Sequence, residues 1–454
     1  MGLLLISLIG CASQQKHMEP PVDAPDKFSA AGSLEVTNRW WTSFDDRQLN
    51  ALVDTAMASN FNLKTAWQRL KEANAVVDRE SADLFPDLEG SIRAVGNQTQ
   101  NNTLDPGSVQ LGLSSVYELD LWGRIRSEVQ AEKLRAQATL ADYQTAALSL
   151  SAEITRTWYR LSEARNEKDL VRKQIKTNKK VLNLLENRFG TGQIRSVDIL
   201  RQRQLLESTR EQLTNVEMRI RLLEHQLSVL LGRPPQRELD HYADELPTLP
   251  PPPVTGVPIE LVRRRPDVQS AFNSLRAADR DLAAAISSQY PRLTLSASVS
   301  SAPDNAQNLF ENWAMSFAGN LVAPILYGGQ LSAEVDRNRA LKKQRLYEYG
   351  QTILTAFREV ENALVQEKMQ RERIRSLEKQ VKLAEQAYDQ LQLEYFNGMA
   401  DYLDVLTALD EVQQLQRDLL SARLTLVEYR IALHRSLAGS FETDREISSR
   451  QSDE

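Results

Sequence analysis

The order of elements in this chain is set by two short stretches, Phe85-Pro86-Asp87-Leu88 and Leu121-Trp122-Gly123-Arg124, each of which returns later in the sequence. Their second copies are Tyr290-Pro291-Arg292-Leu293 and Leu326-Tyr327-Gly328-Gly329, and both shifts are 205 positions (85 to 290 and 121 to 326). A helix face with i, i+4, i+7 spacing repeats at the same shift: Ala66, Leu70 and Ala73 match Ala271, Leu275 and Ala278. We therefore interpret the chain as an internal duplication, in which each copy contains a helix, short strands, a very long helix, a turn and a second helix.

The duplication and its flanking sequences divide the chain into six parts. In order, we expect a lipoprotein signal peptide (1–10), a lipid-anchored N-terminal segment (11–50), a first structural repeat with a β-hairpin at 87–121 (51–246), a Pro-rich linker (247–258), a second structural repeat with a β-hairpin at 292–324 (259–440) and a polar C-terminal tail (441–454). Because Pro250 to Pro253 are consecutive, the linker is expected to be stiff and extended.

Composition excludes several classes of function. A content of 41% hydrophobic, 6% aromatic and 26% charged residues is typical of long, charge-faced helices rather than compact cores. The net charge of −6 leaves no basic footprint for nucleic acid. The histidines lack metal-ligand spacing and are expected on surfaces or helix flanks: His17, His225, His241 and His434. Since no phosphate-binding glycine loop or paired nucleophile and base occurs, we expect no enzyme, no metal site and no cofactor.

Each copy of the repeat contains two segments in which apolar or small residues take every second position, as in a strand with one apolar face. These segments are 88–94 and 109–121 in the first copy and 293–300 and 313–321 in the second. Their length of about ten residues suits a tilted strand that crosses a bilayer. Because no stretch beyond the N-terminus resembles a transmembrane helix, we expect strands in a closed barrel to make any membrane crossing.

Aromatic residues flank the base of both predicted hairpins: Phe85, Trp122, Tyr290 and Tyr327. A hairpin leaves and returns on one side of the membrane, so the residues at its base share one interface. We therefore interpret these four as an interfacial aromatic belt. The alternative is that they are ordinary core residues at helix ends. The polar loops at 97–102 and 301–305 are expected to face the outside.

Four strands cannot close a barrel with a useful interior, because even an eight-stranded barrel is filled by its own side chains. We therefore expect a homotrimer whose twelve strands form one β-barrel.

Proline is absent between Pro106 and Pro234 and after Pro324, so long helices can form in both regions. The stretch from Arg124 to about Asn187 is predicted to form one helix of roughly 90 Å.

A seam of apolar residues at alternating steps of three and four positions predicts that the helix after this long helix pairs as a coiled coil. Its members are Leu213, Val216, Ile220, Leu223, Leu227 and Leu230. Glycines separate the long helix from the shorter one in each copy, at Gly190 and Gly192 and at Gly398, and we expect the tips of helical hairpins there. The predicted fold class is a mixed membrane protein whose β-barrel continues into a long periplasmic α-helical coiled-coil barrel.

The single cysteine, Cys11, ends the apolar run 2–10 and removes disulfides from consideration. Leu8-Ile9-Gly10-Cys11 resembles a bacterial lipobox, in which the thiol receives a diacylglyceryl group, and the run is shorter than a spanning helix. No Lys or Arg precedes the run, which departs from a normal signal peptide and leaves the start codon open. The alternative is a buried cysteine in an N-terminal apolar segment. We expect a covalent lipid on Cys11 and an anchor in the outer membrane.

Four segments together resemble the TolC-like outer membrane factor family, in particular its lipoprotein (NodT-type) branch that serves resistance-nodulation-division efflux systems. The segments are 40–46, 117–124, Arg264-Arg265-Pro266-Asp267 and 324–329, and they occur in the expected order in both repeats. The resemblance covers nearly the whole mature chain. It implies a trimeric exit duct in the Gram-negative outer membrane, with a periplasmic extension that docks on a periplasmic adaptor protein and an inner-membrane transporter.

The same resemblance assigns a periplasmic gate to the segment after Gly398. Asp404 matches an acidic residue that lines the constricted mouth in the family, and three symmetry copies would form an acidic ring. Thr407 stands where the family often has a second aspartate, Asp401 is a candidate for a second ring, and Asp198 is the corresponding residue in the first copy. Ala400 replaces a basic latch residue of some members. The alternative is that these carboxylates only cap or charge helix N-termini.

The sequence therefore predicts a passive outer-membrane exit duct of a tripartite efflux system. A duct for type I protein secretion would share the architecture and remains the alternative within transport. A lipid-anchored coiled-coil scaffold without a pore would leave the aromatic-flanked hairpins without a role. The cargo, whether drugs, metal ions, organic acids or protein, is not specified by any pocket in the sequence.

Overall fold

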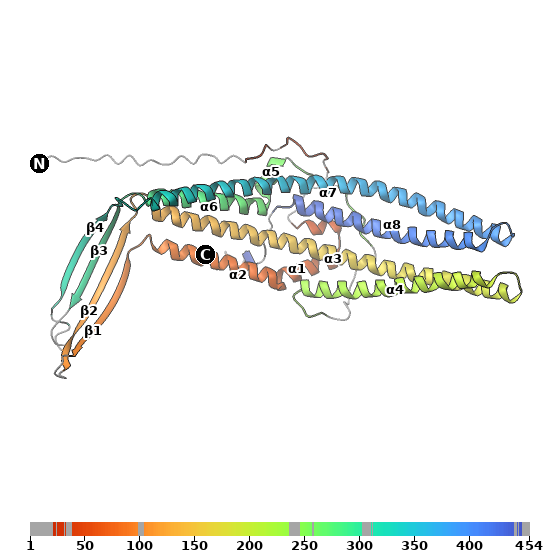
Figure 1. The fold of residues 1–454 in the computed structure, drawn as a ribbon, viewed down its shortest axis with the longest axis horizontal. Coiled ribbons are helices and arrows are strands. Elements are labelled where there is room, and N and C mark those ends of the chain that lie inside the picture. Colours follow the sequence, from red (N-terminus) through yellow and green to blue (C-terminus); the bar gives the residue numbers. More distant parts are fainter. Residues whose placement is uncertain are drawn as a thin grey trace.

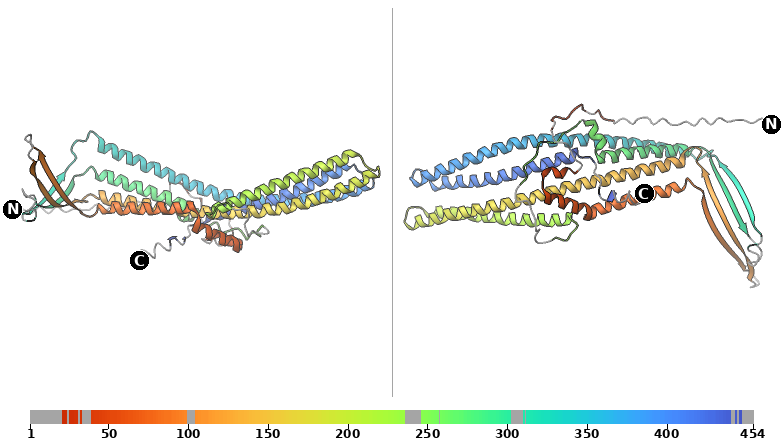
Figure 2. Two further views of the ribbon diagram at one scale, coloured as in Figure 1. Left: turned by 90° about the horizontal axis from the view of Figure 1, so that it is seen from below. Right: turned by 180° about the vertical axis from the view of Figure 1, so that it is seen from behind.

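The computed structural model describes residues 21–439 except 24, 31, 33–38, 99–103, 236–245, 257, 302–309 and 311, together with residues 443, 445 and 446. The chain is elongated, with a β-sheet at one end and the turns of two helical hairpins at the other (Figure 1). Two further views place these features at the same opposite ends (Figure 2).

The elements follow the same order in both copies of the repeat. The first part of the chain contains η1 (Trp40–Phe44), α1 (Arg47–Ser59), α2 (Phe61–Ala82), β1 (Asp87–Gln98), β2 (Leu104–Leu119), α3 (Arg124–Gly190) and α4 (Ser196–Leu230). The second part contains α5 (Pro258–Arg264), α6 (Pro266–Ser287), β3 (Arg292–Ser301), β4 (Ala314–Val322), α7 (Gln330–Phe396) and α8 (Tyr402–Leu437). Helix, two strands, long helix and shorter helix thus occur twice.

The two long helices have equal length. Helices α3 and α7 each contain 67 residues, which is about 100 Å at 1.5 Å per residue. Neither contains proline, and each begins directly after a glycine in the left-handed region, Gly123 (φ 77°) and Gly329 (φ 84°). Such a glycine lets the chain turn sharply from a strand into a helix. Helix α3 ends at Gly190, three residues beyond the predicted end at Asn187.

The strands form one antiparallel sheet in the order β1-β2-β3-β4. One row of paired residues crosses it as Glu89, Ser114, Ser298 and Ser316, and the next row as Gly90, Leu113, Val299 and Met315. Because successive residues of a strand point to opposite faces, one face is polar and the other apolar. The Ser298 and Ser316 hydroxyl oxygens lie 2.7 Å apart on the polar face. The alternation of apolar and polar residues predicted from the sequence is therefore aligned across all four strands of this sheet.

The outer edges of β1 and β4 have no partner strand among the described residues. An unpaired edge exposes a row of backbone N–H and C=O groups that is ready to pair with another strand. The apolar side chains of β4 are also exposed, including Met315, Phe317 and Leu321. Within the described residues, both edges of the sheet are therefore open to pairing with a further strand.

The main hydrophobic core surrounds the middle of α3. Trp40 and Trp158 are both buried in it, and the Trp40 indole N–H donates to the Ser151 hydroxyl at 3.1 Å. The Trp158 indole N–H donates to Asp46 Oδ2 at 2.8 Å, and Asp46 Oδ1 caps α1 by accepting from the N–H of Leu49 at 3.0 Å. The segment 40–46, which contributes to the family resemblance, thus fixes η1 and α1 against the long helix.

A buried ion pair between α7 and α8 anchors the proline-rich linker that precedes the second repeat. Arg430 of α8 is fully buried and donates to Glu367 of α7 from Nε at 2.9 Å and from Nη2 at 2.6 Å. Its Nη1 donates to the carbonyl oxygen of Pro250 at 2.5 Å and to that of Pro251 at 3.2 Å. Arg430 therefore holds the linker at the place where α8 packs against α7.

The expectation that His434 lies on a surface or helix flank was wrong. This residue of α8 is buried, its ring stacks on Trp40 with centroids 5.7 Å apart, and its Nε2 lies 3.4 Å from the Ser43 hydroxyl. Burial, with a contribution from Arg430, lowers the pKa of His434 to about 4. The imidazole is therefore neutral at physiological pH. The periodicity of α8 alone did not reveal this, because the partner Trp40 lies nearly 400 residues away in the sequence (40 to 434).

Candidate functional site

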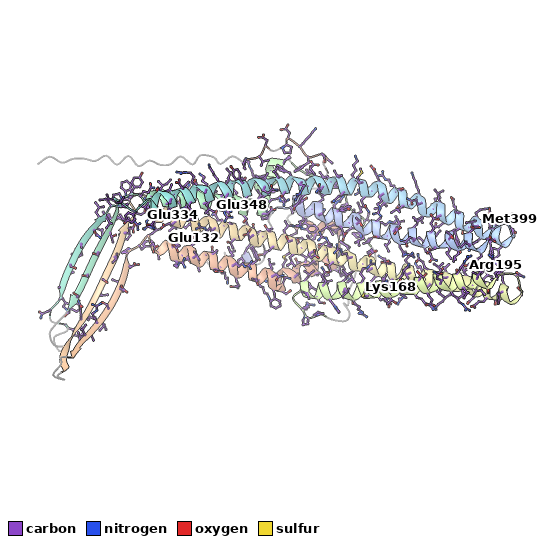
Figure 3. The ribbon with its side chains drawn as sticks, viewed as in Figure 1. Glu132, Lys168, Arg195, Glu334, Glu348 and Met399 are labelled. Atoms are coloured by element: carbon purple, nitrogen blue, oxygen red, sulfur yellow. The ribbon has the colours of Figure 1, made fainter. Side chains whose placement is uncertain are left out.

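The candidate site lies at the hairpin turns, on the end of the molecule opposite the sheet. Arg195, beside the α3–α4 turn, and Met399, in the α7–α8 turn, both appear there with the side chains drawn (Figure 3). Each turn contains a glycine in the left-handed region, Gly192 (φ 75°) and Gly398 (φ 75°). Of the glycines predicted at the hairpin tips, Gly192 and Gly398 are therefore found in the turns, where a residue with a side chain would be strained, whereas Gly190 is the last residue of α3.

The three gate candidates in the second copy lie on the surface of the chain. Asp401 is the N-cap residue of α8 but makes no side-chain capping bond, and Asp404 lies in the first turn of that helix. Both carboxylates are exposed. The hydroxyl of Thr407 is exposed as well and donates to the carbonyl oxygen of Leu403 at 2.8 Å. Capping through the side chain is thus absent for Asp401, whereas Asp404 is placed to charge the helix N-terminus, and its role in lining the mouth remains a prediction.

Asp198 has a different environment from Asp404. Its relative exposure is only 4%, and its nearest basic partner is Arg195, whose Nε lies 3.7 Å from Oδ2. Its Oδ1 has no hydrogen-bond partner among the described residues. The negative charge of Asp198 contributes to raising the pKa of both Tyr395 and Tyr402, although burial is the larger cause for each. Asp198 therefore faces the neighbouring hairpin rather than open solvent, and its predicted role in the gate remains a prediction.

Aromatic side chains connect the two hairpins near their tips. The guanidinium of Arg188, at the end of α3, lies 5.1 Å from the ring centroid of Tyr395 and 5.5 Å from that of Phe396, at the end of α7. Tyr395 in turn packs edge-on against Tyr402, with centroids 5.7 Å apart. Sequence reasoning did not select these residues. The sequence did contain a signal for them, because Tyr395 and Tyr402 lie close to Gly398 on either side of the predicted turn.

Tyr402 also makes a short polar contact between the hairpins. Its hydroxyl donates to Oε1 of Gln202 on α4 at 2.5 Å, and both residues are buried. Burial raises the pKa of Tyr402, so the phenol remains protonated and able to donate. Tyr402 begins α8 and lies two positions before Asp404. The position of the Asp404 carboxylate is therefore linked to the contact between Tyr402 and Gln202.

The predicted aromatic belt lies at the junction of sheet and helices. Trp122 and Tyr290 stack with centroids 5.0 Å apart, and the Trp122 indole N–H donates to the carbonyl oxygen of Pro291 at 2.8 Å. Phe85 and Tyr327 are exposed, as are Trp122 and Tyr290. None of the four is a core residue of this chain. Their placement at a membrane interface remains a prediction.

The predicted lipid-attachment residue lies outside the part of the chain that the structure describes. Cys11 belongs to the residues that are not described. Among the described residues, no group of three or more His, Cys, Asp or Glu could hold a metal ion. None of the helices in that same part is both long and apolar enough to span a membrane.

Comparison with known proteins matches the duplicated architecture. The family model for outer membrane efflux proteins matches residues 52–233 and 257–439, one range in each copy of the repeat. The chain belongs to the outer membrane efflux protein family. Within this family it is 28% identical to the pyoverdine export outer membrane protein OpmQ of Pseudomonas aeruginosa, over 98% of both chains. It is 26% identical to nodulation protein T of Rhizobium leguminosarum bv. trifolii, over 91% of both chains.

The fold of this efflux-family member is shared by solved structures. The outer-membrane channel OprN superimposes with a TM-score of 0.83 at 27% identity, covering 93% of this chain and 98% of that one. The outer membrane protein VceC of Vibrio cholerae gives a TM-score of 0.83 at 25% identity, covering 89% and 100% respectively. The similarity extends over sheet and helices together, so the predicted combination of strands and long helices is confirmed at the level of the single chain.

Proposed function

We propose that this protein is the outer-membrane exit duct of a tripartite efflux system. The observation that carries the proposal is the sheet: in the described part of the chain, four strands form a sheet whose outer edges have no partner strand. This sheet has one polar and one apolar face and continues into helices of about 100 Å. Three chains would pair their free edges into a twelve-stranded barrel with the apolar face toward lipid and the polar face toward the lumen. The α3–α4 and α7–α8 hairpins would then form a periplasmic helical barrel.

The tip of this barrel is the proposed docking end for a periplasmic adaptor and a resistance-nodulation-division-type transporter of the inner membrane. We expect transport through the duct to be passive, with the energy supplied by the inner-membrane transporter. Relatives in the family are named for pyoverdine export, toluene efflux and cation efflux. Such different cargoes suit a polar duct without a specific pocket, and the cargo of this chain follows from its pump.

Two measurements on the purified full-length protein test this function. We expect a trimer in detergent by light scattering and discrete channels in a planar lipid bilayer. A monomer that gives no conductance, even in variants with a weakened mouth such as Asp404→Ala, would contradict the duct and favour a lipid-anchored scaffold. Crosslinking in cells followed by identification of the co-purified adaptor and pump would show whether the system serves efflux or type I secretion.

We predict that Cys11 is the acylated N-terminus of the mature protein. The lipobox-like Leu8-Ile9-Gly10-Cys11 is followed by a polar tether, Ser13-Gln14-Gln15-Lys16. Cys11→Ser should abolish incorporation of labelled palmitate, and label that persists in this variant would rule the prediction out. Because the strands bury more apolar surface than one or two acyl chains, the variant should retain part of its export function.

We also predict that the loops at Asn101 and Asn305, both outside the described residues, face the cell exterior. Asn101→Cys and Asn305→Cys should react with a bulky impermeant maleimide on intact cells, because native Cys11 is blocked by lipid. Met399→Cys provides the matched control, since Met399 is exposed in the turn at the opposite end of the molecule. It should react only after permeabilisation. Protection of both loop cysteines on intact cells would reverse the topology.

A further inference from the structure

Large apolar side chains are exposed at two places on opposite edges of the sheet. Ile325 and Leu326, where β4 turns into α7, have relative exposures of 94% and 88%, and we call this pair the β4 elbow. Phe85 and Leu88, where β1 begins, have relative exposures of 69% and 76%, and we call this pair the β1 base. Strands β4 and β1 are the outermost strands of the sheet (Figure 1). Grouped apolar exposure of this kind indicates contact with another molecule.

The corresponding turn of the first repeat shows what such an elbow contacts. There the turn from β2 into α3 lies against the start of β3: Trp122 stacks on Tyr290, and the carbonyl oxygen of Trp122 accepts from the Ser287 hydroxyl at 3.0 Å. In the ladder beside it, Leu119 lies opposite Leu293. We call this contact the intrachain joint. Because the chain is duplicated, an equivalent joint requires a β1 base beside the β4 elbow, and β1 of the same chain lies at the far edge of the sheet.

The structure determines which residues of the two repeats are equivalent. Before the hairpins the repeats are 205 positions apart, since α2 and α6 begin at 61 and 266, and β1 and β3 begin at 87 and 292. After the hairpins they are 206 apart, since α3 and α7 begin at 124 and 330. The second hairpin is therefore one residue longer, although the sequence motifs repeat at 205 throughout. With these shifts, Leu119 corresponds to Ile325 and Leu293 corresponds to Leu88.

The two faces of the sheet provide an independent check of this equivalence. Carried across with the same shifts, the β2–β3 register places Leu321 opposite the partner's Ile92, and both side chains belong to the apolar face. It places Asn320 opposite the partner's Arg93 on the polar face. A uniform shift of 205 would instead set Asn320 opposite Ile92 and mix the faces. The extra residue in the second hairpin thus brings β4 into line with a further β1.

The chemistry of the two elbows differs. In the first repeat, charges hold the turn: Arg124 Nη2 lies 2.9 Å from Glu118 Oε1, and Arg126 Nε lies 3.0 Å from Asp120 Oδ2. The equivalent positions of the second repeat have no charge; they are Pro324, Leu326, Gln330 and Ser332. Contact of the β4 elbow with a β1 base therefore buries apolar surface instead of pairing charges.

We propose that the β4 elbow packs on the β1 base of a second copy of this chain and forms the interchain joint of the barrel. The proposal rests on the proposed function as an exit duct. In this joint Ile325 lies opposite the partner's Leu88, and Leu326 packs beside the partner's Phe85. A bare strand edge pairs with many strands and in several registers. The apolar contact at its end selects the correct partner strand and register, and it forms only when the copies assemble.

Oxidative crosslinking of the purified full-length protein tests the contact directly. Ile325→Cys with Leu88→Cys should give covalent dimers and trimers, because opposed residues of an antiparallel pair lie within disulfide range. Leu119→Cys with Leu293→Cys is the matched control, since these residues are opposed within one chain, and it should give a crosslinked monomer. Both pairs are made with Cys11→Ser, so that no native thiol remains. A trimer of the first variant that yields no covalent oligomer would overturn the proposal.

Truncation of the elbow tests its contribution to assembly. Leu326→Ala should weaken trimer association by about 10- to 100-fold per joint, the factor that burial of one leucine side chain contributes. Dissociation on dilution in detergent, followed by light scattering, measures the effect. Met315→Ala is the matched control, because Met315 is also exposed, at 68%, but lies in β4 away from the elbow. Equal dissociation of the two variants would show that the elbow faces lipid, as an interfacial belt would, and not a second copy.

A charge transplant separates loss of the joint from loss of the fold. Leu326→Asp introduces the residue of the first repeat without its basic partner and should weaken the trimer further. Addition of Ser332→Arg recreates the pair of Asp120 and Arg126 and should restore much of the association. No recovery in this double variant, with the monomer still folded by circular dichroism, would count against the equivalence of the two elbows. A monomeric wild type without conductance would refute the duct itself, whereas a conducting wild-type trimer without the interchain crosslink refutes only the joint.

Discussion

Replacement of Arg430 by methionine is expected to lower the stability of the protein by about 3–5 kcal/mol per protomer, the usual cost of removing one partner from a buried ion pair. Glu367 would keep its buried carboxylate, and the basic partner left to it among the described residues would be Arg371, whose Nη2 lies 3.0 Å from Oε1. The carbonyl oxygens of Pro250 and Pro251 would lose their donor at the same time. Apparent melting temperature in detergent, followed by circular dichroism, measures the effect.

The matched control is Arg423→Met on the same helix. Arg423 pairs with Glu378 at 3.1 Å, but both side chains are about half exposed, and such pairs contribute about 0–1 kcal/mol. The double variant Arg430→Met with Glu367→Leu should recover much of the stability, because no unpaired buried charge remains. Equal melting of the Arg430→Met and Arg423→Met variants would contradict the assigned importance of the buried pair.

The pH dependence of this pair follows from the carboxylate. Burial alone would raise the pKa of Glu367, but the hydrogen bonds and charge of Arg430 and Arg371 outweigh it, and the pKa is lowered. The stabilisation is therefore present above the ordinary glutamate pKa of about 4.3 and is lost as the pH falls through the lower folded-state value. The difference in melting between wild type and Arg430→Met should accordingly shrink in acid.

The architecture was predictable because it depends on local patterns that occur twice. Alternation over 88–94 and 293–300 defines strands, the absence of proline after Pro324 permits a 67-residue helix, and Gly398 ends it close to the expected place. The buried contact between the amides of Asn178 and Gln413 was not predictable in the same way. Asn178 and Gln413 are 235 positions apart, and polar residues in a helix are ordinarily assigned to its solvent-facing side.

Two of the gate candidates, Asp198 and Asp404, also show a difference that local sequence does not predict. Asp198 and Asp404 stand in similar local sequences, Val197-Asp198-Ile199-Leu200 and Leu403-Asp404-Val405-Leu406, and both lie in the first turn of a helix. One is buried and the other exposed. The difference arises from which helix face packs on the neighbouring hairpin. Local sequence does not encode that choice, so the difference in burial between the two aspartates was not predictable from it.

Substitution of Asp404 by alanine or asparagine is expected to reduce the cation selectivity of the duct. The carboxylate is exposed at the tip, and three symmetry copies in the proposed trimer would place like charges around the narrowest opening. One unit charge at about 4 Å in water contributes about 1 kcal/mol, so we expect the cation-to-anion permeability ratio to fall roughly fivefold. Blockade by trivalent cations should weaken in parallel. Asparagine should act like alanine, because it removes the charge at nearly constant volume.

Capping of α8 predicts the opposite pair of results. If Asp404 only interacts with the helix N-terminus, both variants should lose about 0.3–1 kcal/mol of stability and keep wild-type selectivity. Asp336→Asn is the matched control, since it removes one exposed carboxylate from α7 far from the tip and breaks a surface pair with Arg339. Reversal potentials in a salt gradient and melting are measured on all three variants. Selectivity that is unaltered in Asp404→Ala and Asp404→Asn rules out a position in the lumen, whereas a loss of selectivity confined to these two variants places the carboxylate ring at the mouth.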